Sequence, residues 1–419
     1  MVNTKTPPSR HTIAFVGTYP PKECGIATFT MDAVNATDLA GWHSSVIAVD
    51  TADGCARYDD SKVIGMIDRD DRMSYLRAAR MISRKGISLL AIEHEYGIFG
   101  GDHGDYVLDL VQSVDVPVVV TLHTVLPEPS PDQLRVIREM EPYTSAFIVM
   151  AQTAVVILRD IYGIDEKKVH FVPHGAPMVP FAADKAAKER FGLQGRRVIS
   201  TFGLISPNKG IEDAIAAMPE VVDRDPSAIY LVLGETHPVI KRREGEWYRE
   251  QLEAQVAELG LENNVRFVDK YLSMQELLDY LLATDVYVTP YYANPHQITS
   301  GTLAYALTAG KVIVSTPYLY AKELLAAGRG FLYPFRDVSV LSSTISRLLT
   351  DDALFLETRR RAYAYGRTMT WPTVGLRYSR LFTNLLHERW SHEAARDTLS
   401  MLSIYERETA LVPKTPVYA

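Results

Sequence analysis

The sequence predicts an α/β protein with two doubly wound parallel sheets, each in a domain of its own. Short apolar segments alternate along the chain with segments whose apolar residues recur at helical spacing, which is the signature of such sheets. This alternation runs twice, and a charged stretch at residues 182–197 separates the two series. The chain of 419 residues is also too long for one ordinary hydrophobic core, so two domains are expected.

The first series contains seven apolar segments that are predicted to be strands. They cover residues 12–16, 45–49, 63–66, 89–92, 116–122, 145–150 and 169–172. Helical spacing of apolar residues separates most of them, at residues 73–84, 106–112, 132–140 and 153–162. The loop after the first strand is rich in proline and glycine and leads into a helix from about Ala27. It is similar to a nucleotide-binding strand–loop–helix, although it lacks the G-x-G-x-x-G spacing.

Polar residues follow three of these strands at the point where each strand ends. Glu93, His94 and Glu95 come directly after one strand, and His123 and His174 follow two others. The carboxyl ends of parallel strands open on one crevice, so these side chains are expected to face it together. A lone histidine in such a place is more often structural than catalytic, but three of them favour a functional site.

The second series predicts six strands, at residues 198–202, 229–233, 265–268, 285–289, 311–315 and 330–333. Helices are expected at residues 212–222, 247–259, 274–282, 302–308 and 321–326. From residue 338 to about residue 408 the pattern is only helical, with a break at Trp371 and Pro372. The charged stretch that precedes the series is interpreted as a linker.

The loop that follows the first strand of the second series carries a lysine, Lys209, next to Gly210. A glycine there lets the backbone pass close to a ligand. A lysine at the start of a helix opposes the positive end of the helix dipole, and a bound anion would remove that conflict. A solvated lysine explains the residue equally well.

The segment at residues 290–311 reads as a strand end, a loop and a new helix. Thr299, Ser300 and Gly301 are residue types that start helices, and apolar residues recur at helical spacing after them. A helix that begins at the carboxyl end of a strand points unpaired N–H groups into the crevice, where phosphate groups bind. The alternative is one more ordinary strand–helix unit of the sheet.

Composition excludes several classes of protein. Hydrophobic residues make up 47% of the chain and charged residues 23%, as in a soluble globular protein. The net charge of −7 argues against a nucleic-acid partner. No apolar run reaches the roughly 18 residues of a membrane span, and no signal peptide is evident. The two cysteines provide neither a disulfide framework nor metal spacing. A cytoplasmic location without a bound metal or cofactor is therefore expected.

Taken together, these motifs resemble the family-4 (group 1) retaining glycosyltransferases, whose GT-B fold has two facing Rossmann-like domains. The resemblance covers nearly the whole chain and rests on residues 20–28, His123, residues 172–175, Gly203 with Lys209 and Gly210, and residues 290–311, 316–323 and 328–333. It implies an acceptor-side domain at residues 1–180 and a donor-side domain at residues 181–365. Helices at residues 366–419 would return to the first domain, with hinges near residues 178–195 and 365–372.

The resemblance also implies roles for single residues. The donor would be a nucleotide-diphosphate sugar, bound by Gly25, His174, Gly203, Lys209, Ser300, Gly301, Thr302 and Tyr305. His123 and Gln297 would lie at the transferred sugar as the catalytic pair. A carbohydrate or small-molecule acceptor would meet His94, Glu95 and Tyr96. The oligomeric state, the sugar and the base are left open.

Three positions depart from the family pattern. The E-x7-E motif falls on Gln297 and Tyr305, and Leu204 stands where an arginine usually follows the glycine of the phosphate loop. Gln297 brings no negative charge to an oxocarbenium-like transition state, and Tyr305 cannot accept a bidentate pair as a carboxylate can. Losing one charge-assisted hydrogen bond costs about 1.5–3 kcal/mol. The three positions therefore keep the spacing of the family motif but lose its charged side chains.

The leading hypothesis is a metal-independent hexosyltransferase that retains the anomeric configuration. A sugar phosphorylase on the same fold is an alternative, because a weakened nucleotide site and an anion pocket at Lys209 and Ser300 would suit inorganic phosphate. A non-catalytic binding or regulatory protein is the third, and the absence of both glutamates favours it.

Overall fold

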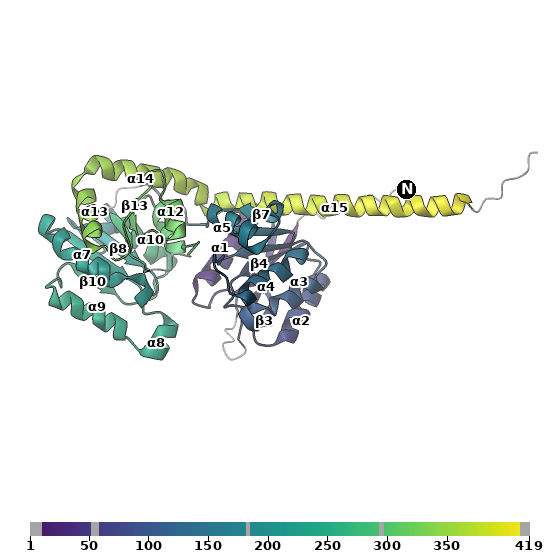
Figure 1. Cartoon of the computed structure of the whole chain (residues 1–419), viewed down its shortest axis with the longest axis horizontal. Coiled ribbons are helices and arrows are strands. Elements are labelled where there is room, and N and C mark those ends of the chain that lie inside the picture. The colour runs from purple at the N-terminus through teal and green to yellow at the C-terminus, as the bar shows by residue number, and fades with distance from the viewer. Residues whose placement is uncertain (1–10, 52–57, 182–184, 293–296, 411–419) are drawn as a thin grey trace, which may run out of the picture.

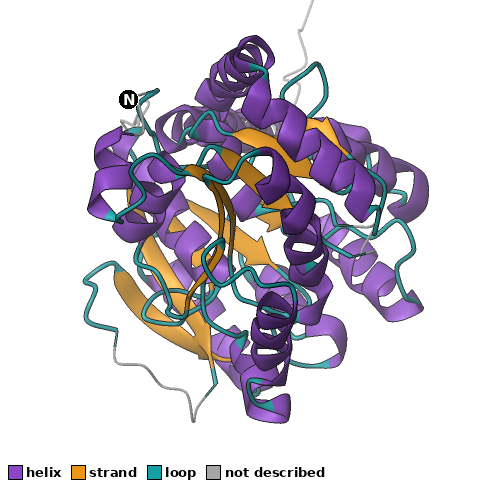
Figure 2. Ribbon diagram, turned by 90° about the vertical axis from the view of Figure 1, so that its left-hand side faces the viewer, coloured by secondary structure: helices purple, strands orange, loops and turns teal. Residues whose placement is uncertain are grey.

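The two predicted series fold into two lobes that lie side by side, each built around one parallel sheet (Figure 1). The computed structural model describes residues 11–51, 58–181, 185–292 and 297–410. Within these residues, no helix combines the length and apolar character that crossing a bilayer requires. Each lobe places helices on both faces of its sheet, as Figure 2 shows.

The N-terminal lobe holds a seven-stranded sheet in the order β3-β2-β1-β4-β5-β6-β7. Its strands are β1 (Thr12–Gly17), β2 (His43–Asp50), β3 (Val63–Asp68), β4 (Leu89–His94), β5 (Val118–Leu122), β6 (Ala146–Val149) and β7 (Val169–Phe171). Its helices are α1 (Gly25–Leu39), α2 (Arg72–Arg84), α3 (Val107–Ser113), α4 (Pro131–Met140) and α5 (Gln152–Ile157). All seven predicted strands are confirmed.

The C-terminal lobe holds a six-stranded sheet in the order β10-β9-β8-β11-β12-β13. Its strands are β8 (Arg197–Phe202), β9 (Ala228–Leu233), β10 (Val265–Val268), β11 (Val286–Thr289), β12 (Val312–Ser315) and β13 (Phe331–Leu332). Its helices are α6 (Lys185–Arg190), α7 (Ile211–Arg224), α8 (Pro238–Glu244), α9 (Trp247–Glu258), α10 (Met274–Ala283), α11 (Gly301–Thr308), α12 (Leu319–Leu324), α13 (Val338–Thr350) and α14 (Asp352–Gly366). The six predicted strands are confirmed, whereas α8 was not predicted.

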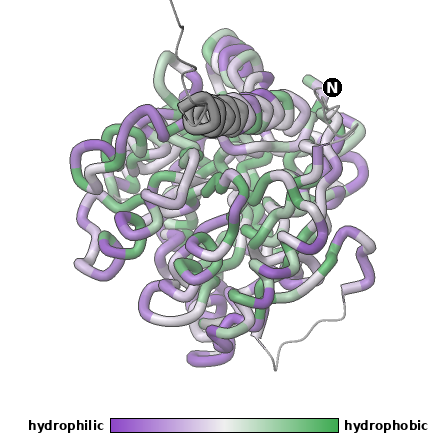
Figure 3. Tube along the Cα trace, turned by 90° about the vertical axis from the view of Figure 1, so that its right-hand side faces the viewer, coloured by the Kyte–Doolittle hydropathy of each residue, from purple (hydrophilic) through white to green (hydrophobic). Residues whose placement is uncertain are grey.

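Burial on both faces explains why the strands are almost continuously apolar. Every residue of β6 and β9 is buried, and all neighbouring strands of both sheets pair in parallel. Figure 3 shows hydrophobic segments in the middle of the molecule and hydrophilic segments around them. The carboxyl ends of these strands are therefore the places where polar residues can reach the space between the lobes.

The last helix, α15 (Trp371–Ala410), crosses back onto the N-terminal lobe and runs past it (Figure 1). The indole N–H of Trp42 donates a 3.0 Å hydrogen bond to the hydroxyl of Ser379 on α15. Gly375 lets α15 approach α1 closely, because a Cβ atom there would lie 2.3 Å from the carbonyl oxygen of Ala36. The expected return of the C-terminal helix to the first lobe is confirmed.

The stretch that was interpreted as a linker is different in the structure. Apart from residues 182–184, which lie outside the described residues, it contains helix α6, and α6 packs on α10. The ring of Phe191 stacks on that of Tyr280 with 3.8 Å between centroids, and Lys188 forms a 2.6 Å ion pair with the buried Asp285. At least Lys188 of this charged stretch is thus paired with a carboxylate of the second lobe.

Candidate active site

Helix α11 begins at the carboxyl end of β11, as predicted. The hydroxyl of Ser300 caps the helix by accepting a 3.3 Å hydrogen bond from the N–H of Leu303. The first turn of α11 contains no acidic side chain, so nothing in it neutralises the positive end of the helix dipole. The hydroxyls of Ser300, Thr302 and Tyr291 follow one another at 3.1 Å, which ties this helix start to the loop after β11.

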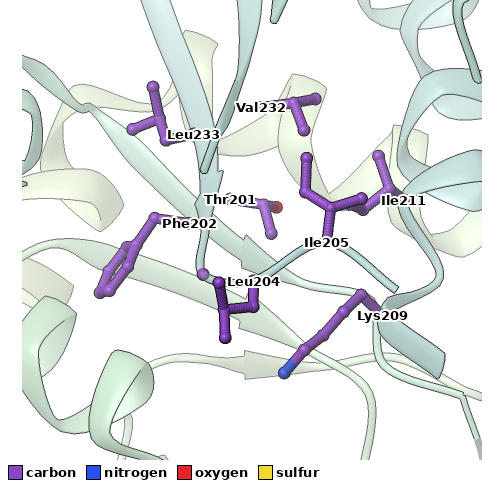
Figure 4. A pocket seen from close by; sticks show the side chains of 9 residues that line it. Thr201, Phe202, Leu204, Ile205, Lys209, Ile211, Val232 and Leu233 are labelled. Atoms are coloured by element: carbon purple, nitrogen blue, oxygen red, sulfur yellow. The ribbon is translucent and has the colours of Figure 1, made fainter. Parts of the chain in front are cut away.

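Lys209 lies beside this helix start and above an aromatic ring. Its ammonium nitrogen is 4.1 Å from the centroid of the Tyr291 ring, which is within the range of a cation–π interaction. Lys209 and Leu204 line the same small hollow at the end of β8, as Figure 4 shows. Tyr291 was missed in the sequence, although its place directly after a buried strand was a signal for it.

The prediction that Lys209 stands at a helix start and opposes the helix dipole is wrong. Lys209 closes a short 3-10 turn, Pro207–Lys209, and α7 begins only after Gly210. The first turn of α7 carries Glu212 and Asp213, which complement its dipole. Lys209 therefore creates no conflict for a bound anion to remove, and its candidacy rests on its position beside α11.

Two glycines allow the loops around Lys209 to come together. Gly210 has a φ of 61°, and a Cβ atom there would lie 2.0 Å from the carbonyl oxygen of Pro290. Gly203 has a φ of 132° and approaches Thr302, whose Cγ2 would be 3.6 Å from an added Cβ. These positions need glycine because other residues rarely adopt such backbone angles. The structure thus brings Gly203, Lys209 and Thr302 together as predicted.

The facing lobe contributes a second helix start. Gly25 is the first residue of α1, and no atom lies within 4 Å of the place where its Cβ would be. The preceding residue, Cys24, caps the helix through its sulfur, and the first turn again contains no acidic side chain. Gly25 therefore lies beside open space at an uncompensated helix N-terminus.

Two of the three predicted histidines meet at one aromatic ring. The ring of Phe29 on α1 packs edge-on against His123 at 4.7 Å and against His174 at 5.1 Å. The two lobes touch here: the hydroxyl of Thr299 donates a 2.9 Å hydrogen bond to the carbonyl of His123, and Gly301 approaches His174 Nε2. Phe29 was missed, although it lies four residues after Gly25 on the predicted helix.

The two ring nitrogens of His174 have different surroundings. Nδ1 donates a 2.6 Å hydrogen bond to the carbonyl of Gly175, while Nε2 faces Gly301 at the start of α11. Burial lowers the pKa of His174 to about 4, so the ring is neutral at pH 7. A neutral ring can sit at a helix N-terminus without repelling the positive end of its dipole.

The three residues predicted on the acceptor side, His94, Glu95 and Tyr96, differ in how deeply they are buried. His94 is fully buried with Tyr96 and Phe99, and its ring nitrogens have no hydrogen-bond partner among the described residues. Burial lowers its pKa to about 3. Glu95 is half-buried and accepts hydrogen bonds from the Thr124 hydroxyl and from the N–H of Tyr96. Glu95 is therefore partly accessible, whereas the ring of His94 is enclosed; an acceptor contact of Glu95 and Tyr96 stays a prediction.

The altered motif residues lie on opposite sides of the α11 start. Gln297 is half-buried. Its side-chain amide donates a hydrogen bond to the backbone carbonyl of Thr299, and its backbone carbonyl accepts one from the N–H of Tyr320. Tyr305 is only 9% exposed and lies between His174 and Phe202, with ring centroids 6.3 and 6.5 Å away. Burial, followed by the nearby Asp32, raises the pKa of Tyr305, so its hydroxyl stays protonated. Their predicted contacts with a sugar and a ribose stay predictions.

Glu93, predicted as a polar residue at the end of its strand, pairs with one of the histidines. It is fully buried on β4, and its Oε2 lies 2.9 Å from His123 Nε2. Neither its burial nor this partner was predicted from the sequence. Among the described residues, no three His, Cys, Asp or Glu side chains gather as metal ligands would.

The amino-acid sequence is similar to those of known glycosyltransferases. Residues 183–369 match the model of the family "Glycosyl transferases group 1". A D-inositol 3-phosphate glycosyltransferase of Corynebacterium efficiens is 24% identical over 318 residues, which is 72% of each chain. A 2-deoxystreptamine glucosyltransferase of Streptomyces kanamyceticus is 27% identical over 217 residues, covering 48% of this chain and 50% of the relative.

Solved structures support the fold over most of the chain. A sucrose-phosphate synthase from Thermosynechococcus elongatus superimposes with a TM-score of 0.73 and 18% identity, covering 90% of this chain and 100% of its own. HepE of Anabaena, solved with UDP and glucose, gives a TM-score of 0.69 and 16% identity over the same shares. The chain therefore has the GT-B fold of two facing parallel sheets, and its residues 183–369 match the group 1 glycosyltransferase family.

Proposed function

We propose that the chain moves a sugar from a nucleoside diphosphate sugar to an acceptor hydroxyl, with retention of configuration and without a metal ion. One observation carries the proposal: the start of α11 lies beside both Lys209 and His174. Tyr291 links the lysine to this helix start through a 3.1 Å contact between its hydroxyl and that of Thr302, and Gly301 approaches His174 Nε2. Free N–H groups and one ammonium suit a diphosphate.

The leaving group is the part of the reaction that these residues would serve. As the bond between the sugar C1 and the phosphate oxygen breaks, negative charge grows on the diphosphate. Preorganised N–H dipoles and a cation at that place lower the barrier electrostatically. The bond from C1 to the acceptor oxygen forms on the same face, and the acceptor's proton passes to a phosphate oxygen. With Leu204 in place of arginine, Lys209 carries more of this charge.

The surroundings of the transferred sugar would come from both lobes. His123 lies where the lobes meet, since its carbonyl accepts from Thr299 of the second lobe. Gln297 is two residues from Thr299 and half-buried, so its amide can hydrogen-bond sugar hydroxyls. HepE was solved with UDP and glucose, which supports a nucleotide-sugar donor for a chain of the same fold. Glu95 and Tyr96 would face the acceptor.

A thermal-shift screen tests the proposal. UDP, GDP, ADP, their sugar derivatives and inorganic phosphate are each added to the full chain. A ligand that binds only the folded state raises the melting temperature, and about 100 times its Kd adds roughly 2.7 kcal/mol. We expect one nucleotide series to stabilise the protein and Lys209→Met to remove most of that shift. Stabilisation by phosphate alone would contradict the proposal and favour a phosphorylase.

A second experiment concerns the chemical step. His123→Ala should lower kcat far more than it weakens donor binding, because a contact made mainly in the transition state affects kcat. NMR of the glycoside product reports the anomeric configuration. Equal losses in kcat and donor affinity, or a product of inverted configuration, would contradict these roles.

A further inference from the structure

The buried carboxylate of Glu93 has one hydrogen-bond partner in the part of the chain that the structure describes, and that partner is the ring of His123. Glu93 Oε2 lies 2.9 Å from His123 Nε2, and Oε1 has no partner among the described residues. Glu93 is 0% exposed, and the residues before it on β4 are apolar and buried. A charged group buried so fully is costly unless it is paired and hydrogen-bonded.

The backbone around Glu93 makes room for this side chain. Gly17, at the end of the adjacent β1, faces it, and a Cβ atom on Gly17 would lie 3.0 Å from the Cβ of Glu93. From the other direction α15 brings Tyr378, which is buried and whose pKa is raised by burial and then by the charge of Glu93. The carboxylate is thus enclosed by β1 and α15 as well as by its own strand.

The imidazole of His123 is held on its other sides too. Phe29 packs edge-on against the ring, and Thr299 donates to the backbone carbonyl of His123. Because a carboxylate only accepts hydrogen bonds, the nitrogen that faces Glu93 must carry a proton. That nitrogen is Nε2, and the bond it makes determines which tautomer the ring adopts.

We propose that Glu93 is a positioning residue for sugar transfer, which keeps the proton of His123 on Nε2 and leaves Nδ1 as the working nitrogen. Nδ1 can then accept a hydrogen bond from a hydroxyl of the transferred sugar without the ring having to turn or change tautomer. This assignment rests on the proposed role of His123 at that sugar. Glu93 itself, with no exposed surface, does not touch the substrate.

The first test needs no substrate. Nitrogen NMR of protein labelled at its 11 histidines distinguishes protonated from bare ring nitrogens, and the His123 signals are assigned by their loss in His123→Gln. We expect His123 to carry its proton on Nε2 at pH 7.5. In Glu93→Gln and in the shorter Glu93→Asp, a population with the proton on Nδ1 should appear. A wild-type ring protonated on Nδ1, or variants with unchanged signals, would overturn the proposal.

The second test follows turnover of the sugar nucleotide that stabilises the protein most in the thermal-shift screen, as hydrolysis when no acceptor is present. Glu93→Gln should lower kcat by about 10–100-fold while KM changes less than about threefold, because the ring stays in place but loses its fixed tautomer. Combined with His123→Ala, it should add no further loss. Glu139→Gln, an exposed residue of α4, is the matched control and should behave as the wild type. An additive loss in the double variant would show that Glu93 acts independently of His123.

The two tests separate this inference from the proposed function. The expected NMR signals together with a protein that neither binds nor turns over any sugar nucleotide would refute the function and leave the histidine–glutamate pair intact. Turnover of a sugar nucleotide, with His123 signals that are unchanged in the Glu93 variants, would support the proposed function and refute the positioning role of Glu93. Melting temperatures of all variants show whether a loss of turnover is merely a loss of folded protein.

Discussion

Glu323 should control how firmly the two lobes close, because it caps a helix of the opposite lobe. Its carboxylate, on α12, accepts hydrogen bonds from the N–H of Gln152 at 2.7 Å, from the N–H of Thr153 at 3.0 Å and from the Thr153 hydroxyl at 3.0 Å. The residue at the N-cap of α5 is Ala151, whose side chain makes no capping bond. The cap that α5 lacks in its own lobe is therefore supplied by the other.

Removal of this carboxylate has a calculable effect. Losing a helix cap costs about 0.5–2 kcal/mol, and hydrogen bonds to a charged group contribute about 1.5–3 kcal/mol. A loss of about 1–3 kcal/mol corresponds to roughly a 5–150-fold shift between closed and open lobes. The effect falls on the contact between the lobes, because both sheets keep all their internal bonds.

Amide hydrogen exchange of Gln152 and Thr153 in Glu323→Ala measures this directly. Both amides should exchange about 5–150 times faster than in the wild type, while amides in the middle of β5 keep their protection. Lys322→Gln is the control, since Lys322 is an exposed neighbour on the same helix. Unchanged exchange at both amides would refute the reasoning. Nucleotide-sugar binding should weaken as well, because α12 also supports Gln297 through the N–H of Tyr320.

Three further predictions concern single side chains in and near the candidate active site. Burial, opposed by the indole of Trp371, raises the pKa of Asp32 from 3.8 to about 6, so the folded state binds this proton more tightly than the unfolded state. The free energy of unfolding therefore falls as pH rises through that window. Asp32→Asn should raise the free energy of unfolding at pH 7 by at most ~3 kcal/mol, but not at pH 3.5; an equal gain at both would contradict this. Leu204→Arg should strengthen binding of the nucleoside diphosphate by about 1.5–3 kcal/mol in calorimetry, since it adds a cation beside Lys209; unchanged affinity would show that the diphosphate does not reach the hollow. Tyr305→Phe should weaken nucleotide binding by about 0.5–1.5 kcal/mol if its hydroxyl meets a ribose, and should leave phosphate affinity as it was.

The sequence by itself determined the architecture, because a strand that is buried on both faces of its sheet is apolar at nearly every position. Residues 228–233 and 146–149 are apolar throughout, and both lie in the interior of their sheets. The start of helix α11 at Ser300 could also be predicted from the sequence, because an N-cap bond joins residues that are only three apart in the chain. Gly25, Gly203, Lys209 and Thr302 were named as site residues through the family resemblance, and the structure places each of them at a loop or helix start.

The linker and the dipole conflict were misjudged for a related physical reason. The charged stretch at residues 182–197 was interpreted as a linker, but its Lys188 pairs with Asp285, 97 residues away. Lys209 was placed at a helix start, yet the turn that precedes α7 and the acids within its first turn remove the conflict. Local composition indicates that a side chain is charged, whereas the fold decides whether that charge is solvated or paired.

Only the tertiary structure decided which residues meet between neighbouring strands and between the lobes. Glu93 and His123 lie 30 residues apart, Thr299 and His123 176 apart, and Glu323 and Thr153 170 apart. Periodicity specifies which face of an element is buried, but it does not specify the partner on another element, because that depends on how sheets and lobes pack. His123 and His174 could thus be placed together from the sequence, while the pairing of Glu93 with His123 and the carboxylate that joins the lobes could not.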